Sequence, residues 1–292
     1  MKPTTNRRGP YVGRRTVLLS LAGIVVGAAE LQMSVPDSLP GAAGDAATAD
    51  GTLGALSLPQ LARVEPRAPV SVTTTIPRWA RRWKAPVYDL GDFIDRMPHT
   101  HFPKRSIMLT MDDGPQPYWT PRFLRLFEKH DVQATFHLIG AQVPSQRKLV
   151  RAMASQGHVL ANHSWTHDEG LPYRSRKQIR QEIERTNDAI EKAAKVRPRI
   201  YRAPGGAWGH RIFEELAHQQ MLPLGWDIDP RDWALPGTSS IAYALRQAGP
   251  GNILLAHDGG GDRAQTYAAL SQVIPALKAR GLHFVTLPVP QV

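Results

Sequence analysis

The sequence contains no cysteine among its 292 residues. This absence excludes disulfide bonds, catalysis by a thiol and zinc sites built on cysteine ligands. It also fits an exported protein, which in this way avoids thiol oxidation. No internal repeat is found along the chain. The composition is that of a globular protein, with 42% apolar and 21% charged residues, and an α/β barrel can use most of this length as one domain.

Acidic residues are missing before residue 30, where five basic residues lie. Removal of this segment lowers the formal net charge from +11 to +6. A mildly basic body suits an anionic polymer such as a bacterial cell wall. The one candidate for a nucleic-acid contact is the cluster PRWARRWK at residues 77–84, which is also typical of a basic amphipathic connector. Because no basic–aromatic nucleic-acid module is present, we expect no nucleic-acid partner.

Residues 1–29 have the pattern of an export signal. Arg14 and Arg15 precede an apolar run that starts at Val17 and ends in small residues at 27–29, which suit a signal peptidase. The arginine pair is similar to a twin-arginine export signal. The apolar run is shorter than the ~20 residues that a membrane-spanning helix needs. We therefore expect a cleaved signal peptide, no stable membrane span in the mature form, and a secreted or cell-wall-associated protein.

The rest of the chain divides into two regions. Residues 30–86 carry scattered Ala, Gly, Ser, Thr and Pro without clear periodicity, which predicts a flexible linker. Over residues 87–292, apolar runs alternate with helical patterns, which predicts a single folded domain. Strands are expected at residues 106–111, 134–139, 158–161, 199–202, 222–226, 252–256 and 283–287.

Helical patterns lie between these strands. Thr120 is predicted to cap the first helix, with Pro121 in its first turn. Further helices are expected at residues 145–156, 175–195, 210–220, 239–248 and 265–280. This alternation predicts an α/β fold, either a mostly parallel sheet or a (β/α) barrel. In such folds the chemistry gathers at the carboxyl ends of the strands.

Ionisable side chains directly follow five of the predicted strands. In chain order they are Asp112 and Asp113; His163 and His167; Arg202; Asp227, Asp229 and Asp232; and His257 and Asp258. One polar loop carries little information, because surface loops are polar in any protein. Five such loops, each joined to a buried strand, indicate a functional site at one end of the sheet.

His163 and His167 are four residues apart, a spacing that places both imidazoles on one face of a helical turn, within reach of one metal ion. A hydrogen-bonded pair in a loop is the alternative interpretation. A nearby carboxylate would complete a set of two histidines and one carboxylate with open positions for water, which zinc, iron and cobalt all use.

The other polar residues also have structural alternatives. Asp112 and Asp113 are followed by glycine, as in many turns, although the spacing of a calcium loop is absent. Asp229 and Asp232 also suit the caps of a turn, and Arg202 suits an ordinary surface arginine. Four tryptophans beside these residues suit either the core or the apolar faces of sugar rings: Trp165, Trp208, Trp226 and Trp233.

Five short motifs occur in the order TMDDGP, HSWTH, RAPGG, DPRDW and LLAHD. In this order they resemble the motifs of the polysaccharide deacetylases, which carry a NodB-homology domain and form carbohydrate esterase family four. The resemblance extends from Val87 to Pro288. It implies a distorted (β/α) barrel that holds a divalent metal, most often Zn²⁺, with Co²⁺ or Ni²⁺ as alternatives. It also implies removal of acetyl groups from N-acetylglucosamine polymers or from acetylated xylan.

The resemblance also implies a role for each motif residue. Asp113, His163 and His167 would bind the metal, and Asp112 would be the general base. The remaining roles fall to Arg202, which would hold Asp112; His257, the general acid; Asp232, which would act on His257; and Gly205, Leu255 and Trp233 on the side of the oxyanion and the substrate.

Two positions depart from the family pattern. Met111 replaces the usual aromatic residue of the first motif, and Gly205 replaces the usual tyrosine of the third. The change at Gly205 keeps a backbone donor for the oxyanion but removes an aromatic wall from the substrate site. The run HDGGGDRAQT after the fifth motif predicts a flexible loop at the mouth of the site, with no assigned role.

These observations favour a metal-dependent N-deacetylase of peptidoglycan or chitin-type oligosaccharides that acts as a monomer on an acetylated polysaccharide. An O-deacetylase of the acetylxylan esterase type shares the whole site and stays open. A non-catalytic carbohydrate-binding relative would be expected to lack the base or the metal ligands, and none is lost here. A two-histidine, one-carboxylate oxygenase conflicts with the alternation of strands and helices, because its fold is a jelly roll.

Overall fold

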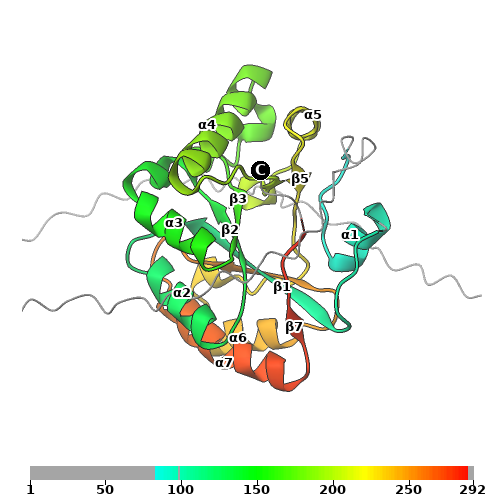
Figure 1. Ribbon diagram of the computed structural model, residues 1–292, viewed down its shortest axis with the longest axis vertical. Helices are drawn as coiled ribbons and strands as arrows, with labels where there is room; N and C mark the ends of the chain where they lie inside the picture. Colours follow the sequence, from blue (N-terminus) through cyan, green and yellow to red (C-terminus); the bar gives the residue numbers. More distant parts are fainter. Residues whose placement is uncertain (1–82, 98, 289–292) are drawn as a thin grey trace, which may run out of the picture. The chain divides into compact units, whose positions relative to one another are not determined.

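The computed structural model describes residues 83–97 and 99–288 (Figure 1). The predicted signal at residues 1–29 and almost all of the predicted linker at residues 30–86 lie outside the described residues. The described part is built on one sheet with helices packed against it. Its strands are β1 (Ser106–Gly114), β2 (Thr135–Leu138), β3 (Val159–Asn162), β4 (Ile200–Tyr201), β5 (Leu222–Pro223), β6 (Ile253–His257) and β7 (His283–Phe284).

The strand order is β5-β4-β3-β2-β1-β6, and β7 also pairs with β1. Every pairing between these strands is parallel. The segment after β5 returns to the other end of this order, because Ile228 forms a parallel bridge with Leu254 of β6. The described part is therefore a distorted, half-closed barrel of parallel strands with helices, and the predicted (β/α) fold class is confirmed.

All seven predicted strands are present, but their ends differ from the predictions. β1 is longer than predicted, because it continues through Asp112 and Asp113 to Gly114. β4, β5 and β7 contain two residues each and are shorter than predicted. β5 ends at Pro223, although the N–H of Leu224 still donates to the Tyr201 carbonyl at 2.9 Å.

Each predicted helix is present, as α2 (Thr120–Lys129), α3 (Arg147–Ser155), α4 (Arg176–Ala194), α5 (His210–His218), α6 (Thr238–Arg246) and α7 (Ala264–Ala279). Helix α1 (Leu90–Arg96) was not predicted, because seven residues are too few to show a clear helical period. Short 3₁₀ helices complete the described part: η2 (Gly140–Ser145), η3 (Leu171–Tyr173), η4 (Pro204–Gly206) and η5 (Asp232–Ala234).

The predicted cap of α2 is wrong. Trp119 occupies the N-cap position, and Thr120 is the first helical residue. The Thr120 hydroxyl accepts a hydrogen bond from the backbone N–H of Gln116 at 2.9 Å and donates one to Asp258. The threonine therefore connects α2 to the residue that follows β6, instead of satisfying the free N–H groups of its own helix.

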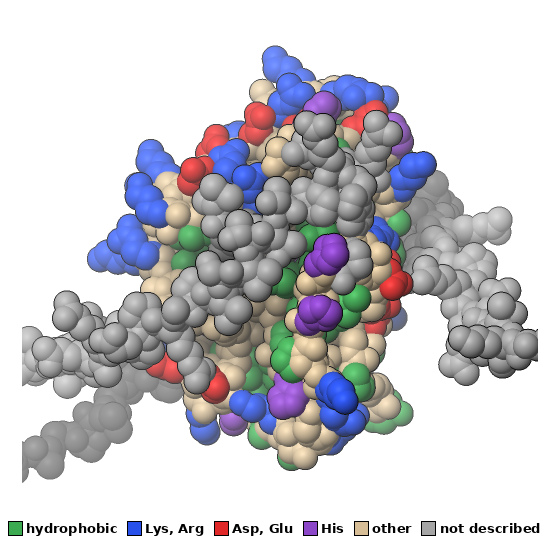
Figure 2. Space-filling model, turned by 45° about the vertical axis from the view of Figure 1, so that its right-hand side comes forward, with side chains coloured by type: hydrophobic (Ala, Val, Ile, Leu, Met, Phe, Trp, Pro, Cys, Tyr) green, Lys and Arg blue, Asp and Glu red, His purple; other side chains and the backbone are tan. Residues whose placement is uncertain are grey.

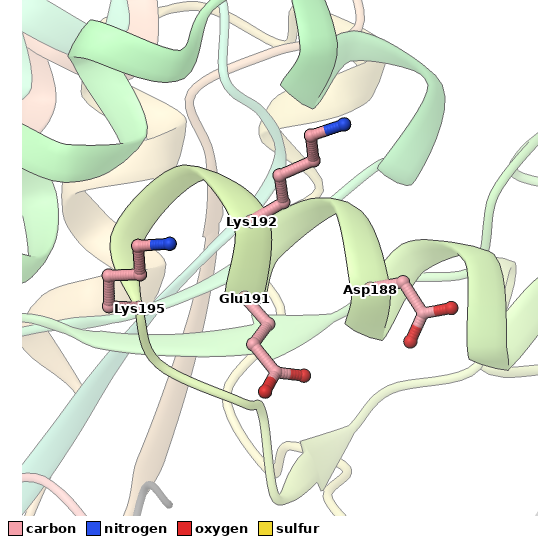
Figure 3. A pocket seen from close by; sticks show the side chains of 4 residues that line it. All are labelled: Asp188, Glu191, Lys192 and Lys195. Carbon is pink, nitrogen blue, oxygen red and sulfur yellow. The ribbon is translucent and has the colours of Figure 1, made fainter.

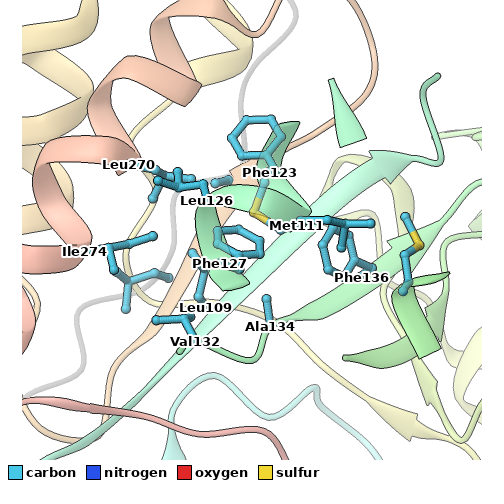
Figure 4. Close-up of a cluster of buried hydrophobic side chains, with 14 of the residues drawn as sticks. Leu109, Met111, Phe123, Leu126, Phe127, Val132, Ala134, Phe136, Leu270 and Ile274 are labelled. Atoms are coloured by element: carbon cyan, nitrogen blue, oxygen red, sulfur yellow. The ribbon is translucent and has the colours of Figure 1, made fainter. Parts of the chain in front are cut away.

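A large apolar core lies between the sheet and helices α2, α3, α6 and α7 (Figure 4). Leu109 and Met111 of β1 meet Phe123 and Phe127 of α2 and Phe136 of β2, and all five side chains are fully buried. Burial of one such side chain contributes roughly 1.5–3 kcal/mol. Because β1 is covered on both faces, it forms a continuous apolar run in the sequence. Met111, which replaces an aromatic residue of the family pattern, belongs to this core.

The surface of the described part carries both signs of charge. On the face shown in Figure 2, Lys and Arg side chains form several separate groups, with Asp and Glu side chains among them. None of the helices within residues 83–97 and 99–288 combines the length and the apolar character needed to cross a bilayer.

Candidate active site

Asp112 and Asp113 lie at the carboxyl end of β1, where the strand is irregular. Adjacent residues of a regular strand point to opposite faces. Here the pairing with β2 slips between Asp112 and Gly114, and Asp113 has a φ of 72°, in the left-handed region. Such a bulge re-aims a side chain. As a result, one oxygen of each carboxylate approaches the same atom, His163 Nε2, at 3.8 Å for Asp112 and 3.4 Å for Asp113.

Asp113, His163 and His167 form a compact group of possible metal ligands. Asp113 Oδ1 lies 3.4 Å from His163 Nε2 and 3.2 Å from His167 Nε2. One ligand atom from each of the three residues lies within 4.8 Å of the others. His163 Nδ1 lies 2.9 Å from the carbonyl oxygen of Arg202, so Nδ1–H donates to this oxygen and the Nε2 lone pair faces Asp113.

The helical turn predicted for the histidine pair is wrong. His163 follows β3 and His167 lies in the loop beyond it, with no helix between them. Ser164 and His167 both have positive φ, of 63° and 60°. The loop is held by a hydrogen bond from the backbone N–H of His167 to the Ser164 hydroxyl at 3.0 Å, and by one from the Ser164 N–H to the Asn162 side chain at 2.8 Å. Two left-handed residues therefore bring the imidazoles together, which the four-residue spacing alone does not show.

This group fits a divalent metal. Asp113 Oδ1 is buried and has no hydrogen-bond partner within the described residues. A buried carboxylate oxygen without a partner is costly, and a cation beside it would remove this cost. One carboxylate oxygen and two imidazole nitrogens form the donor set that zinc, iron and cobalt use. Burial opposes ionisation of Asp113, but the imidazoles of His163 and His167 beside it hold its pKa well below the usual value.

Asp112 belongs to a second, fully buried cluster. Its Oδ1 lies 2.8 Å from Arg202 Nη1, and Arg202 also donates to the Thr110 hydroxyl at 2.7 Å and to the Gly225 carbonyl at 2.7 Å. Arg202 has no exposed surface, so its interpretation as a surface arginine is wrong. Burial would raise the pKa of Asp112, but Arg202 and then two histidines lower it below the usual value. The Asp112 carboxylate therefore stays ionised.

The second partner of Asp112 is His137 of β2, which the sequence analysis missed. His137 Nδ1 lies 2.8 Å from Asp112 Oδ1, and the two residues face each other in the β1–β2 pairing. Burial, then the charge of Arg202, lowers the pKa of His137 to about 3, so the ring is neutral. In the sequence, the one indication of this role was that His137 lies inside an apolar strand. That pattern by itself favours an ordinary core position.

His257 and Asp232 form a third pair. His257 Nδ1 lies 2.7 Å from Asp232 Oδ1, and the backbone N–H of His257 donates to Asp232 Oδ2 at 2.9 Å. Asp232 has no exposed surface, and the hydroxyl of Thr266 also donates to its Oδ2 at 2.9 Å. Burial would lower the pKa of His257, but the hydrogen bond to Asp232 and nearby carboxylates raise it to about 9. The imidazole is therefore protonated near neutral pH.

The other acidic residues of the fourth and fifth motifs have different surroundings. Asp227 accepts a hydrogen bond from the Ile253 N–H at 2.7 Å, and Asp229 accepts one from the Arg231 N–H at 2.8 Å. Both are exposed; Asp227 contacts the first residue of β6, and Asp229 contacts the turn before η5. Asp258 is fully buried, and burial raises its pKa to about 7.

Three residues were predicted on the oxyanion and substrate side. Gly205 has a φ of 57°, and a Cβ placed on it would lie 2.8 Å from the carboxyl carbon of Glu169. Glu169, which the sequence analysis missed, thus occupies the space that a side chain at position 205 would enter. Leu255 is buried in β6, and Trp233 is 42% exposed next to Asp232.

The remaining tryptophans are partly buried beside charged or aromatic groups. Arg202 lies 5.3 Å from the ring centre of Trp226, and Arg185 lies 4.1 Å from that of Trp165. Trp208 stacks on Phe213 with 5.5 Å between ring centres. Trp226 and Trp208 also pack against buried apolar clusters, as the core interpretation expects.

A separate hollow of about 410 Å³ lies on α4 (Figure 3). It is lined by Asp188, Glu191, Lys192 and Lys195. Arg197 forms ion pairs with Asp188 at 2.9 Å and with Glu191 at 2.6 Å, so both acidic residues that line the hollow have partners. None of the predicted site residues lines this hollow.

Comparison with known proteins identifies the family to which the chain belongs. Residues 99–222 match the polysaccharide deacetylase family. A chitooligosaccharide deacetylase of Sinorhizobium fredii is 37% identical over 209 residues, which cover 68% of this chain and 97% of that protein.

Two solved structures show the same relationship. A peptidoglycan N-acetylglucosamine deacetylase is 30% identical with a TM-score of 0.61, covering 64% of this chain and 88% of that chain. A family 4 acetyl xylan esterase from Clostridium thermocellum, solved with a cobalt ion, is 34% identical with a TM-score of 0.58, covering 62% of this chain and 87% of that chain. The chain therefore belongs to the polysaccharide deacetylase family.

Proposed function

We propose that the protein is a metal-dependent hydrolase that removes N-acetyl groups from N-acetylglucosamine-containing polysaccharide, of the peptidoglycan or chitin type. The products are acetate and a free amine. The observation that carries this proposal is the convergence of Asp113, His163 and His167 beside the buried Asp112–Arg202 pair. Relatives that are named for chitooligosaccharides and for peptidoglycan support the same reaction.

Asp113, His163 and His167 would hold the metal, and we propose Zn²⁺. Co²⁺ and Ni²⁺ are the alternatives, and the relative solved with cobalt supports the first of these. When bound, a divalent metal supplies Lewis acidity: it polarises the acetyl carbonyl and makes the attacking water more acidic. The hydrogen bond from His163 Nδ1 to the Arg202 carbonyl keeps the ring oriented for this ligation.

We assign the general base to Asp112. Arg202 and His137 keep its carboxylate ionised and restrict its orientation, so one oxygen is free to accept a proton from the attacking water. Arg202 is a positioning residue here, because it contacts the base and the backbone of the segment after β5.

We assign the general acid to His257. An amine is a poor leaving group unless its nitrogen receives a proton as the bond breaks. The ring is protonated at neutral pH, and Asp232 holds Nδ1, which leaves Nε2–H to donate this proton. Asp232 therefore sets both the orientation and the charge of the acid.

On the substrate side, the backbone N–H of Gly205 is the proposed second donor to the oxyanion. Leu255 would contact the acetyl methyl group, and the exposed face of Trp233 would receive a sugar ring. Because Glu169 fills the space beside Gly205, this wall of the site is acidic instead of aromatic.

We further propose export by the twin-arginine route, with the protein secreted or associated with the cell wall, where it acts as a monomer. The support for export is the sequence of residues 1–29. A wall polymer would meet the enzyme in this location.

An acetate assay tests the function. Acetate release is measured from N-acetylglucosamine oligomers, peptidoglycan and acetylxylan, with zinc and after chelation. We expect release from the first two, and loss of release on chelation. Release from acetylxylan alone would support the O-deacetylase, which the acetyl xylan esterase relative makes the second candidate. No release from any substrate would support a non-catalytic carbohydrate-binding protein.

Two variants separate the assigned roles in the same assay. Asp113→Ala should lose bound metal, whereas Asp112→Asn should keep the metal and lose turnover by about 10²–10⁴-fold. Metal content is measured directly on the purified variants. Equal loss of metal in both would contradict the division between ligand and base.

A further inference from the structure

The loop between β6 and α7 carries a buried arginine with unusual partners. Arg263, the N-cap residue of α7, is 3% exposed. Its Nε donates to the Gly259 carbonyl at 2.7 Å, its Nη2 to the Gly260 carbonyl at 2.7 Å, and its Nη1 to the Asp232 carbonyl at 3.3 Å. Within the described residues, no ion pair joins this guanidinium to a carboxylate.

A guanidinium that is buried without a contacting carboxylate carries a desolvation cost, which opposes stabilisation of the fold. Its fixed fork of donors instead defines where its acceptors lie. The three acceptors of Arg263 come from two segments: the loop after β6 and the 3₁₀ helix η5. Arg263 therefore fixes the position of the loop relative to η5.

The loop end of this connection packs against the metal-ligand residue Asp113. A Cβ on Gly259 would lie 1.9 Å from the Asp113 carbonyl oxygen, and a Cβ on Gly260 would lie 2.6 Å from Asp113 Oδ2. Such distances exclude any side chain at either position without movement. The glycine run thus lets the backbone touch both the carbonyl and the carboxylate of Asp113.

The other end of this connection is Asp232, the partner of His257. Thr266, in the first turn of α7, donates to Asp232 Oδ2 at 2.9 Å, while His257 contacts Oδ1 at 2.7 Å. In the run HDGGGDRAQT, Gly259 and Gly260 therefore lie against Asp113, and Thr266 contacts Asp232. Arg263 connects the loop of the two glycines to Asp232. This accounts for a motif to which the sequence analysis assigned no role.

We propose that Arg263 is a positioning residue: through the carbonyl oxygens of Gly259, Gly260 and Asp232 it sets the place of the Asp232–His257 pair relative to Asp113. The inference rests on the proposed function, in which Asp113 holds the metal and His257 gives the proton. Both groups must meet one substrate, so an error in their separation slows the chemical step more than it weakens binding.

The experiment compares Arg263→Lys and Arg263→Met with Arg280→Met in the full chain loaded with zinc. Arg280 lies at the other end of α7 and also donates to two backbone carbonyls, those of Arg246 at 2.6 Å and Ala248 at 3.0 Å. It therefore controls for the loss of arginine–carbonyl bonds that do not involve the site. Thermal unfolding of each variant shows how much stability is lost.

For acetate release we expect both Arg263 variants to lower kcat about tenfold to a hundredfold. KM should change by no more than about twofold, since the substrate contacts remain. Arg280→Met should keep the wild-type kcat. If Arg263→Met fails to fold, Arg263→Lys carries the test, since lysine keeps the positive charge but not the fork of donors.

A second readout does not depend on turnover. In the chelated protein, the ¹H NMR signal of His257 Nδ1–H is shifted downfield by its hydrogen bond to Asp232. We expect this signal to move upfield or broaden in Arg263→Lys and Arg263→Met and to stay in place in Arg280→Met. A role of charge alone would leave it unchanged in Arg263→Lys, because lysine keeps the positive charge.

The outcomes separate this inference from the proposed function. If the wild type releases acetate, and both Arg263 variants match Arg280→Met in kcat and in the NMR signal, the positioning role is overturned. If no substrate releases acetate, the proposed function fails, and a change of the NMR signal in the Arg263 variants still supports the connection between the loop and the Asp232–His257 pair.

Discussion

Asp112 and Asp113 are neighbours in the chain but have different surroundings. Asp112 contacts a fully buried arginine and a neutral histidine, whereas Asp113 faces two imidazoles and has one carboxylate oxygen without a hydrogen-bond partner. Two adjacent carboxylates resist ionisation together unless opposite charges are near. The bulge at Asp113 lets Arg202 serve one carboxylate while the histidine pair serves the other.

Asp232, the third carboxylate of the site, raises the pKa of His257, and this predicts that activity depends on pH. The general acid must be protonated, and its pKa is about 9, so activity should be present below this pH and lost as the pH rises through it. Asp232→Asn removes the carboxylate that raises this pKa, while burial still lowers it. The alkaline limb should therefore move to lower pH by about one unit or more.

The measurement is the pH profile of kcat/KM for acetate release by the zinc-loaded enzyme. Asp229→Asn is the matched control, because Asp229 lies in the same segment but is exposed and, among the residues that the structure describes, accepts a hydrogen bond from the backbone N–H of Arg231 alone. An unchanged alkaline limb in Asp232→Asn would show that another group sets it.

At the scale of elements, the site depends on loops that follow strands and on the glycines that let them approach. Gly260 has a φ of 72°, and its Cα lies close enough to Asp113 that a Cβ would meet Oδ2 at 2.6 Å. Gly251, at the other end of β6, has a φ of 97° and no atom within 4 Å of an added Cβ. The two positions thus share a left-handed backbone that only glycine adopts readily, but Gly260 alone of the two touches Asp113, the proposed metal ligand.

We expect Gly260→Ala to weaken zinc binding about tenfold to a hundredfold, since groups that orient a metal ligand have effects of this size. Gly251→Ala should keep wild-type affinity although both variants lose some stability from the left-handed backbone. Affinity is measured by titration with a chromophoric chelator as competitor. Equal affinities in the two variants would mean that the approach of Gly260 to Asp113 has no effect on the metal.

The strands could be predicted from sequence, but the contacts between their ends could not. The apolar run before Asp112 marks a buried strand, because a parallel strand covered on both faces carries no alternation. In contrast, the partnership of His137 with Asp112 depends on the register between β1 and β2. The place of Glu169 depends on a loop with left-handed residues, and no spacing in the sequence shows this.

The motif residues themselves were found because each follows a strand and because their order resembles a known family. Their roles were implied by that resemblance, and the structure adds the distances that make the roles physically reasonable. The helical turn expected for His163 and His167 shows the limit of spacing arguments: the right residues were identified for a geometry that the loop does not have.

At the scale of the whole described part, the proposed metal ligands come from strands that are not neighbours. Asp113 is the last residue but one of β1, while His163 and His167 follow β3, and β2 lies between these strands in the sheet. A metal bound by all three residues would therefore cross-link two segments that the sheet connects only through β2. Because the unfolded chain cannot hold these residues together, binding should stabilise the fold.

We expect zinc to raise the thermal unfolding midpoint of the wild type. At a free zinc concentration a hundred times its Kd, binding adds about 2.7 kcal/mol. For a domain of this size, that corresponds to a rise of roughly 5–10 °C. Differential scanning calorimetry with and without chelator measures the rise.

Asp112→Asn should show the same rise, because the Asp112 carboxylate belongs to the Arg202 cluster, whereas Asp113→Ala should lose most of it. Eleven histidines offer zinc weak sites in the unfolded chain, and the Asp113→Ala curve measures this background. A full rise in Asp113→Ala would place the stabilising metal elsewhere and would remove the cross-link between β1 and the loop after β3.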